Sequence, residues 1–268
     1  EALDAIRRGV LAGASDTAVV TVPFGTGSTF DEAVAALDSQ ASFVRVPTDA
    51  SSSCEAGERV ADSLRNGSAV IVEGGHNSSP DCGVGFLEGL LGAPGIDPRQ
   101  PEALADALTR AQALVSDAEV DLVCAASTAR PLLGLDSVLA VAPDLEPIEA
   151  QDTALTAALT QAFAHRPLGR HQLLDGVDVH AARQRGSGAG GGVGAVIAAI
   201  GGRIVTTGDL LSQLLGLETA LDGVDLVIVA EPELASPVLA ESTLDCITRA
   251  AATHALPVVA ITHRSSLS

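Results

Sequence analysis

Short apolar runs alternate with amphipathic stretches along most of the chain. Residues 1–12 carry apolar side chains at helical spacing, whereas residues 18–22 form a continuous apolar run rich in β-branched side chains, which is typical of a strand. Asp209 stands where it can act as the N-cap of a later helix. The same criteria predict further helices over residues 30–37, 55–64, 84–91, 102–114, 153–164, 209–215 and 243–254, and further strands over 43–46, 69–72, 120–125, 203–205, 225–230 and 257–261.

This alternation indicates an α/β fold in which a parallel, Rossmann-like sheet is flanked by helices. We expect residues 1–92 and 187–268 to form one discontinuous Rossmann-like domain. Residues 93–186 are then a smaller inserted segment or a reduced second α/β domain, and the Pro-rich segment 94–101 is the candidate linker. Parallel sheets of this kind bind ligands outside the carboxyl ends of their strands. A site is therefore expected among the loops 25–29, 73–83, 126–130, 206–208 and 231–237.

Composition narrows the range of partners. The 268 residues include 15 basic and 34 acidic ones, all the basic residues are Arg, and the formal net charge is -19. This balance argues against a nucleic acid or an anionic membrane as partner, since both need a cationic surface. No apolar run reaches the length of a membrane helix. The four Cys residues form no Cys-x-x-Cys pair, which favours reduced thiols and a cytoplasmic location over a zinc site. The oligomeric state is left open, with a homodimer as one alternative.

A glycine-rich segment at residues 185–194 is the densest motif. It contains a Gly-x-Gly-x-x-Gly pattern ahead of an apolar helix, and such a turn lets backbone amides and a helix N-terminus approach a phosphate. No apolar strand leads into it and no Walker lysine follows, so a nicotinamide site is disfavoured. An anion-binding turn and close packing of the helix on the sheet both stay open. The candidate substrate- or phosphate-binding residues are Arg185, Gly186, Ser187, Gly188, Gly190 and Gly191.

Two carboxylates follow predicted strands. The polar loop 73–83 contains Asn77 and Asp81, which could place a substrate hydroxyl beside a base, although Asp81 could equally cap the helix at 84–91. Glu231 follows the strand predicted over 225–230, a position that suits a magnesium ligand or a base, with chance placement as the alternative. The six His residues have no ligand spacing, so no metal ligand set is predicted.

Taken in chain order, these motifs resemble the bacterial glycerate kinase family (type 1), of which the chain looks like a divergent and shortened member. Residues 186–195 are similar to the family's Gly-Ala-Gly-Ala-Ala-Gly-Gly-Leu-Gly-Ala segment, and residues 221–231 to its Leu-x-Gly-Ala-Asp-Leu-Val-Ile-Thr-Gly-Glu segment. Residues 70–83 and 131–134 match two further motifs. The resemblance implies ATP-dependent phosphorylation of D-glycerate or a similar hydroxy acid, with ATP and Mg2+ and with Asp81 and Glu231 as catalytic residues.

The chain departs from the family motifs mainly at charged positions. Glu233 stands where the family has Arg, Ala235 where it has Asp, and Ser127 where it has an Asp before the Pro-Leu-Leu-Gly motif. Phosphoryl transfer depends on positioning and charge neutralisation, so each missing cation would cost about 3 kcal/mol or more. A non-catalytic relative that binds a ligand or a partner is therefore the alternative to an active kinase. The candidates to replace the missing cations are Arg130, Arg185 and Arg203.

Overall fold

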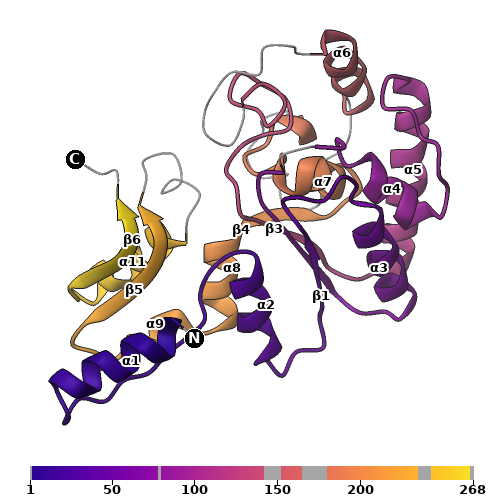
Figure 1. Ribbon diagram of the computed structural model, residues 1–268. Helices are drawn as coiled ribbons and strands as arrows, with labels where there is room; N and C mark the ends of the chain where they lie inside the picture. The colour runs from indigo at the N-terminus through magenta and orange to yellow at the C-terminus, as the bar shows by residue number, and fades with distance from the viewer. Residues whose placement is uncertain (1, 78–79, 142–151, 165–179, 235–242, 266–268) are drawn as a thin grey trace. The chain divides into compact units, whose positions relative to one another are not determined.

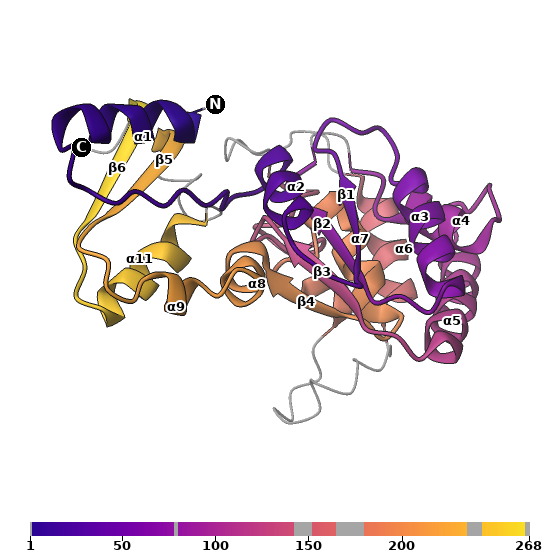
Figure 2. The same cartoon turned by 90° about the horizontal axis from the view of Figure 1, so that it is seen from below.

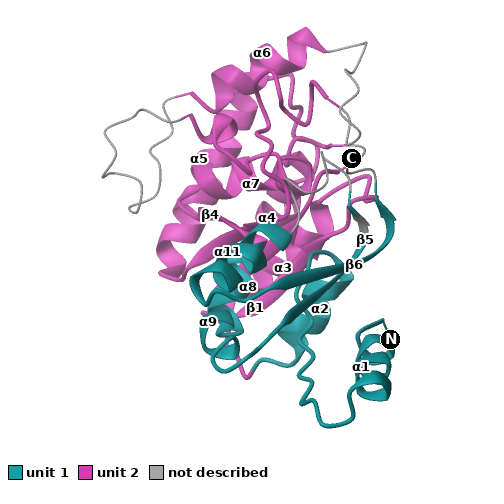
Figure 3. Cartoon of the chain, turned by 90° about the vertical axis from the view of Figure 1, so that its left-hand side faces the viewer, with its two compact units in different colours: residues 1–37, 208–268 teal, residues 38–207 magenta. Residues whose placement is uncertain are grey.

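The computed structural model describes residues 2–77, 80–141, 152–164, 180–234 and 243–265 (Figure 1). The chain divides into two compact units, unit 1 (residues 1–37 and 208–268) and unit 2 (residues 38–207), as Figure 3 shows. These bounds differ from those of the predicted domains, because residues 93–186 add β3 (Leu122–Ala126) and α5 (Pro101–Ala118) to the layers that residues 38–92 begin. The predicted domain division stays a prediction.

Unit 2 is built on a four-stranded parallel sheet. Its strands lie side by side in chain order, and β2 and β3 are buried at every position, as the central strands of a helix-covered parallel sheet must be (Figure 2). The predicted parallel sheet with flanking helices is thus confirmed. The strands are β1 (Ser42–Val46), β2 (Val70–Gly74), β3 and β4 (Arg203–Thr206).

One face of this sheet shares a hydrophobic core with helices that include α3 (Cys54–Arg65), α4 (Val84–Leu91), α5 and α7 (Ala189–Ala199). Alternate strand residues such as Val44, Val70 and Cys124 point into that core. The residues between them, including Ile71 and Val123, are also buried but belong to the opposite face. Two smaller elements complete the unit: α6 (Thr153–Ala162) contacts α5, and the 3-10 turn η2 (Ala181–Arg183) contacts α7.

Unit 1 contains a second parallel sheet of two strands, β5 (Val227–Leu234) and β6 (Val258–Ser265). The predicted strand at 18–22 is wrong: these residues form a loop in which Val20 is 86% exposed, because an apolar run becomes a strand only where a neighbour takes its backbone hydrogen bonds. Among the described residues of this part of the chain, the helices are α1 (Ala2–Gly13), α2 (Ser28–Ala35), α8 (Thr207–Leu214), α9 (Leu217–Ala220) and α11 (Leu244–Thr253).

Two boundary predictions need correction. α8 begins at Thr207, so Asp209 lies in its first turn and not at its N-cap, where its charge still favours the helix N-terminus. β5 continues to Leu234, so Glu231 lies inside this strand and not beyond its end. None of the described helices combines the length and the apolar character that a membrane span requires.

Candidate functional site

The glycine-rich segment lies against the carboxyl ends of β1 and β2. A Cβ placed on Gly74 would lie only 2.8 Å from the Cα of Gly190, and one placed on Gly190 would lie 3.3 Å from the side chain of Val46. Gly190 also adopts a left-handed conformation with φ 61°, which favours glycine. Because these glycines have no side chain, the backbone at the start of α7 can contact the sheet directly.

Six amides of this segment, those of residues 186–190 and 192, donate to carbonyl oxygens of the protein, and three of these bonds reach the loops that follow β2 and β3. The hydroxyl of Ser187, which is fully buried, accepts a hydrogen bond from the Leu132 amide at 2.9 Å. Arg185 by contrast is exposed. Packing of the helix on the sheet accounts for these contacts, while phosphate binding by residues 186–191 stays a prediction. The three bonds to these loops run from the amide of Gly186 to the carbonyl oxygen of Ala129 (3.0 Å), from Gly188 to Arg130 (2.9 Å) and from Gly190 to Gly75 (2.9 Å).

Asp81 joins the N-termini of two helices. One carboxylate oxygen accepts hydrogen bonds from the backbone N–H and the hydroxyl of Ser53, the N-cap residue of α3, at 2.7 and 2.8 Å. The other oxygen accepts from the amide of Gly83, the N-cap residue of α4, at 3.0 Å. Three donors from the protein thus occupy this carboxylate. The contacts support the capping interpretation of Asp81 and extend it to a second helix.

Asn77 ties two loops together. Its side-chain amide donates to the carbonyl oxygens of Pro47 at 3.3 Å and Ala50 at 3.0 Å, and the residue is only 4% exposed. Gly191 packs against the same loop, since a Cβ added there would lie 3.4 Å from the Cβ of Asn77. The structure therefore brings Asn77, Asp81 and the glycine-rich segment together through packing and hydrogen bonds within the protein, and their predicted roles in binding and catalysis stay predictions.

A row of hydrogen-bonded polar side chains, to which the sequence analysis assigned no role, runs across the carboxyl ends of β2, β3 and β4. The hydroxyl of Ser127, which directly follows β3, donates to a carboxylate oxygen of Glu73 on β2 and lies 2.8 Å from the hydroxyl of Thr207, which follows β4. Glu73 is 2% exposed. Burial, followed by the charge of Glu73, raises the pKa of the neighbouring Cys124 thiol to about 12. The sequence signal for this row of polar side chains was Glu73, a charged residue near the end of an otherwise apolar strand.

Two further side chains, one titratable and one cationic, lie in the loops that follow β2 and β3. His76 and Arg130 are close enough that the charge of Arg130 adds to the effect of burial, and together they lower the pKa of His76 to about 4. His76 is therefore neutral at pH 7. Its Nδ1 atom is buried and has no hydrogen-bond partner among the described residues. Arg130 is 9% exposed and donates to the carbonyl oxygen of Val141 at 3.3 Å.

A buried guanidinium, a neutral imidazole and a hydroxyl at one edge of a sheet suit a small anion that also carries a hydroxyl group. Arg130 would attract the anion, since charge-assisted hydrogen bonds are strong where water is excluded. No group of three or more His, Cys, Asp and Glu side chains in the described part of the chain could hold a metal ion. A magnesium ion that arrives with nucleotide phosphates keeps most of its ligands from water and phosphate and needs no such cluster.

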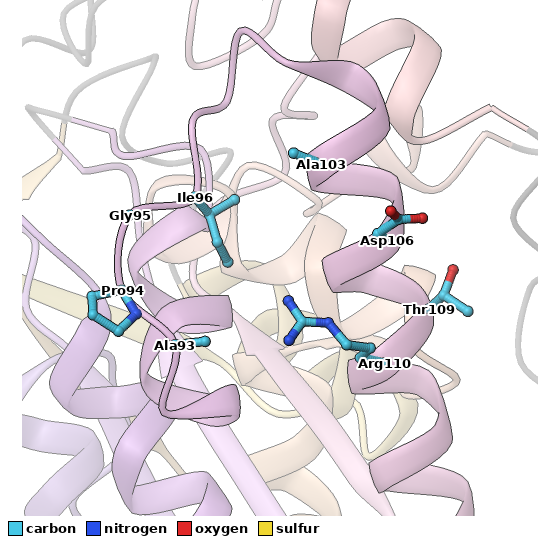
Figure 4. A pocket seen from close by; sticks show the side chains of 8 residues that line it. All are labelled: Ala93, Pro94, Gly95, Ile96, Ala103, Asp106, Thr109 and Arg110. Atoms are coloured by element: carbon cyan, nitrogen blue, oxygen red, sulfur yellow. The ribbon is translucent and has the colours of Figure 1, made fainter.

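Glu231 lies in unit 1 and the other predicted site residues lie in unit 2. It pairs in register with Thr262 of β6, and burial raises the pKa of its carboxyl group. A surface pocket of about 570 Å3 lies elsewhere in unit 2, where the loop from Ala93 to Ile96 faces Arg110 of α5 (Figure 4). None of the predicted site residues lines this pocket, so it adds nothing to the candidate site.

The model of the glycerate kinase family matches residues 33–267. A solved structure described as "putative glycerate kinase 2" from Salmonella typhimurium LT2 matches with a TM-score of 0.53 and 21% sequence identity, over 84% of this chain and 68% of that chain. At this identity the likeness shows the fold alone. No curated protein matches.

Proposed function

Since the chain belongs to the glycerate kinase family, we propose that it binds a small hydroxy acid of the glycerate class at the carboxyl edge of the unit 2 sheet and phosphorylates it with ATP and Mg2+. Family membership supports a kinase-like function in general terms. The substrate class and the place of binding are the proposal. The observation that carries it is the buried Arg130 beside the neutral His76.

Arg130 is the group that would hold the carboxylate of the acid. Its side chain is almost fully buried, so its attraction for an anion is less screened by water than that of a surface arginine. His76 would complete the contact, because its buried Nδ1 atom lacks a partner in the described part of the chain and a buried polar atom normally has one. An oxygen of the ligand would supply that partner.

The chain's own residues would bind and orient the acid, while Mg2+ bound to ATP would neutralise charge on the transferred phosphoryl group. The sequence has Glu233 in place of the family's Arg and has no lysine, and Arg130 is the one arginine that is buried among the described residues. Phosphoryl transfer depends on positioning and electrostatics, so this single arginine would supply a large share of the stabilisation of the transition state. We expect slow turnover for this reason.

A non-catalytic ligand-binding protein is the second candidate, and one observation favours it. The carboxylate of Asp81, a catalytic residue by resemblance, is occupied by donors from Ser53 and Gly83 and holds two helices in place. A protein of this kind would bind the same acid at the same edge and transfer no phosphate. The two candidates therefore differ in turnover and not in binding.

A thermal-shift titration with D-glycerate, ATP alone and magnesium-ATP tests the proposal. Ligand at about 100 times its dissociation constant should stabilise the folded protein by about 2.7 kcal/mol, which raises the melting temperature. The proposal expects a shift with D-glycerate that Arg130→Gln abolishes and that Arg110→Gln, an exposed arginine on α5, leaves in place. A shift with magnesium-ATP supports the kinase. No shift with any of the three ligands would contradict both candidates.

A further inference from the structure

Glu73, Ser127 and Thr207 share one face of the unit 2 sheet. Glu73 pairs in register with Ala125, and Ala125 pairs with Val205. Ser127 follows Ala125 by two residues, and residues two apart along a strand point to the same side. Thr207 begins α8 directly after β4, and its hydroxyl lies 2.8 Å from that of Ser127. The amide of Ser127 still donates to the carbonyl oxygen of Gly74 at 2.9 Å, so the strand geometry of β3 continues to Ser127.

The direction of the hydrogen bonds follows from the chemistry of the three side chains. The hydroxyl of Ser127 has one proton and donates it to a carboxylate oxygen of Glu73. In the contact of 2.8 Å between the two hydroxyls, Thr207 must then be the donor. The oxygen of Ser127 has two lone pairs, of which Thr207 takes one. Towards a ligand, Ser127 therefore acts as an acceptor only.

Of these three hydrogen-bonded side chains, Ser127 is also the one that a ligand can reach. Glu73 is 2% and Thr207 is 1% exposed, whereas Ser127 is partly exposed. Arg130 follows three residues later in the same loop, and its charge acts on His76, which follows Glu73 by three residues. We expect a small acid held by Arg130 through its carboxylate to extend along this edge toward the Ser127 oxygen. A side chain that can only accept forms a hydrogen bond with a hydroxyl group of the ligand. It forms no such bond with an analogue that lacks this hydroxyl group.

We propose that Ser127 determines specificity for the hydroxyl group of the bound acid, with Glu73 and Thr207 as positioning residues that fix the direction of its hydrogen bond. The inference rests on the proposed function, because it concerns the same ligand and the same edge of the sheet. It deepens that function by assigning the recognition of the hydroxyl to one oxygen atom. A hydrogen bond to a hydroxyl contributes about tenfold in affinity at a partly exposed position.

Calorimetric titration with D-glycerate and propionate tests the assignment, since propionate has the carboxylate and lacks both hydroxyls. The wild type should bind D-glycerate at least about tenfold more tightly than propionate. Ser127→Ala should weaken D-glycerate binding and leave propionate binding unchanged, so that the preference falls below about threefold. Ser127→Thr keeps a hydroxyl and should retain the preference. The matched control Ser116→Ala, at an exposed position on α5, should behave as the wild type.

The outcomes separate this inference from the proposed function. An unchanged preference in Ser127→Ala overturns the role of Ser127 and leaves the kinase proposal standing. A wild type that prefers D-glycerate but forms no phosphate ester overturns phosphoryl transfer and leaves the role of Ser127 standing. A wild type that binds neither acid overturns both. If Ser127→Ala does not fold, Ser127→Cys gives the same measurement, because a thiol is a weak acceptor.

Discussion

Ser53 donates two hydrogen bonds to one carboxylate oxygen of Asp81, from its backbone N–H at 2.7 Å and from its hydroxyl at 2.8 Å. The same hydroxyl accepts from the amide of Phe86 at 2.8 Å. Together with the bond from Gly83, these contacts hold the first turns of α3 and α4 against each other. Asp81 thus has a structural role that any account of its chemistry must include.

Replacing Asp81 should therefore lower stability. Asp81→Ala leaves two amides and a hydroxyl without their acceptor, and we expect a loss of about 2–4 kcal/mol in the free energy of unfolding. Ser53→Ala should cost about 1–2 kcal/mol, and the double variant less than the sum, because the two residues share the contact. Urea unfolding followed by circular dichroism measures this, since the chain has no Trp or Tyr for fluorescence. Full stability with lost turnover in Asp81→Ala would instead mark it as catalytic.

The crossing of α3 and α4 sets a second prediction. A Cβ on Gly57 would overlap the carbonyl oxygen of Phe86, and one on Gly89 would overlap that of Cys54. Gly89→Ala should destabilise the protein by about 3 kcal/mol or prevent folding, because the backbones cannot separate without opening the core. Gly9→Ala is the matched control, since nothing lies within 4 Å of its added Cβ within α1. It should be neutral or stabilise by up to about 1 kcal/mol.

Stability should depend on pH through His76. Its pKa in the folded protein is about 4, below the ordinary value of 6.5, with burial as the main cause and Arg130 as the second. Between pH 6.5 and 4 the unfolded chain binds a proton that the folded protein does not, so stability falls as the pH drops through this window and is unaffected above it. His76→Gln should show a flatter profile of melting temperature against pH than the wild type. Equal slopes in both proteins would contradict the burial of this imidazole.

Two thiols should resist modification in the native protein. Burial is the main cause that raises the pKa values of Cys82 and Cys124 to about 12, so their reactive thiolate form is scarce at pH 8. Alkylation with iodoacetamide, mapped by mass spectrometry, should modify Cys54 first, since it is only partly buried. Cys82 and Cys124 should react only after unfolding in urea. Rapid native modification of either would disprove their placement in the core.

Many helices and strands of the fold could be predicted from the sequence. The helix predicted over 84–91 is α4 residue for residue, because Gly83 and Gly92 bound an apolar stretch at both ends. The strand predicted over 18–22 failed, since its apolar character shows only that it can pair and not that a partner strand is adjacent. Local pattern identifies elements, whereas pairing depends on the whole chain.

The candidate site shows the same division. Motifs in the sequence drew attention to Asp81 and the glycine-rich segment, whose contacts in the structure are mostly structural. The polar groups that face each other across the strand ends, Glu73 with Ser127, are 54 residues apart in sequence. No spacing rule connects them, because strand order brings them together. The rule that ligands bind at the carboxyl ends of parallel strands led to the loops of the proposed site, whereas the residues proposed to act there follow from the structure.

The most direct measurement of the central claim is transfer of radiolabelled γ-phosphate from magnesium-ATP to D-glycerate. The account predicts that the wild type forms a labelled phosphate ester slowly, that Arg130→Gln reduces the rate at least about tenfold, and that Arg110→Gln does not. A wild type that binds D-glycerate and forms no labelled ester at high enzyme concentration would contradict phosphoryl transfer. The chain would then be a ligand-binding member of its family that has lost the reaction.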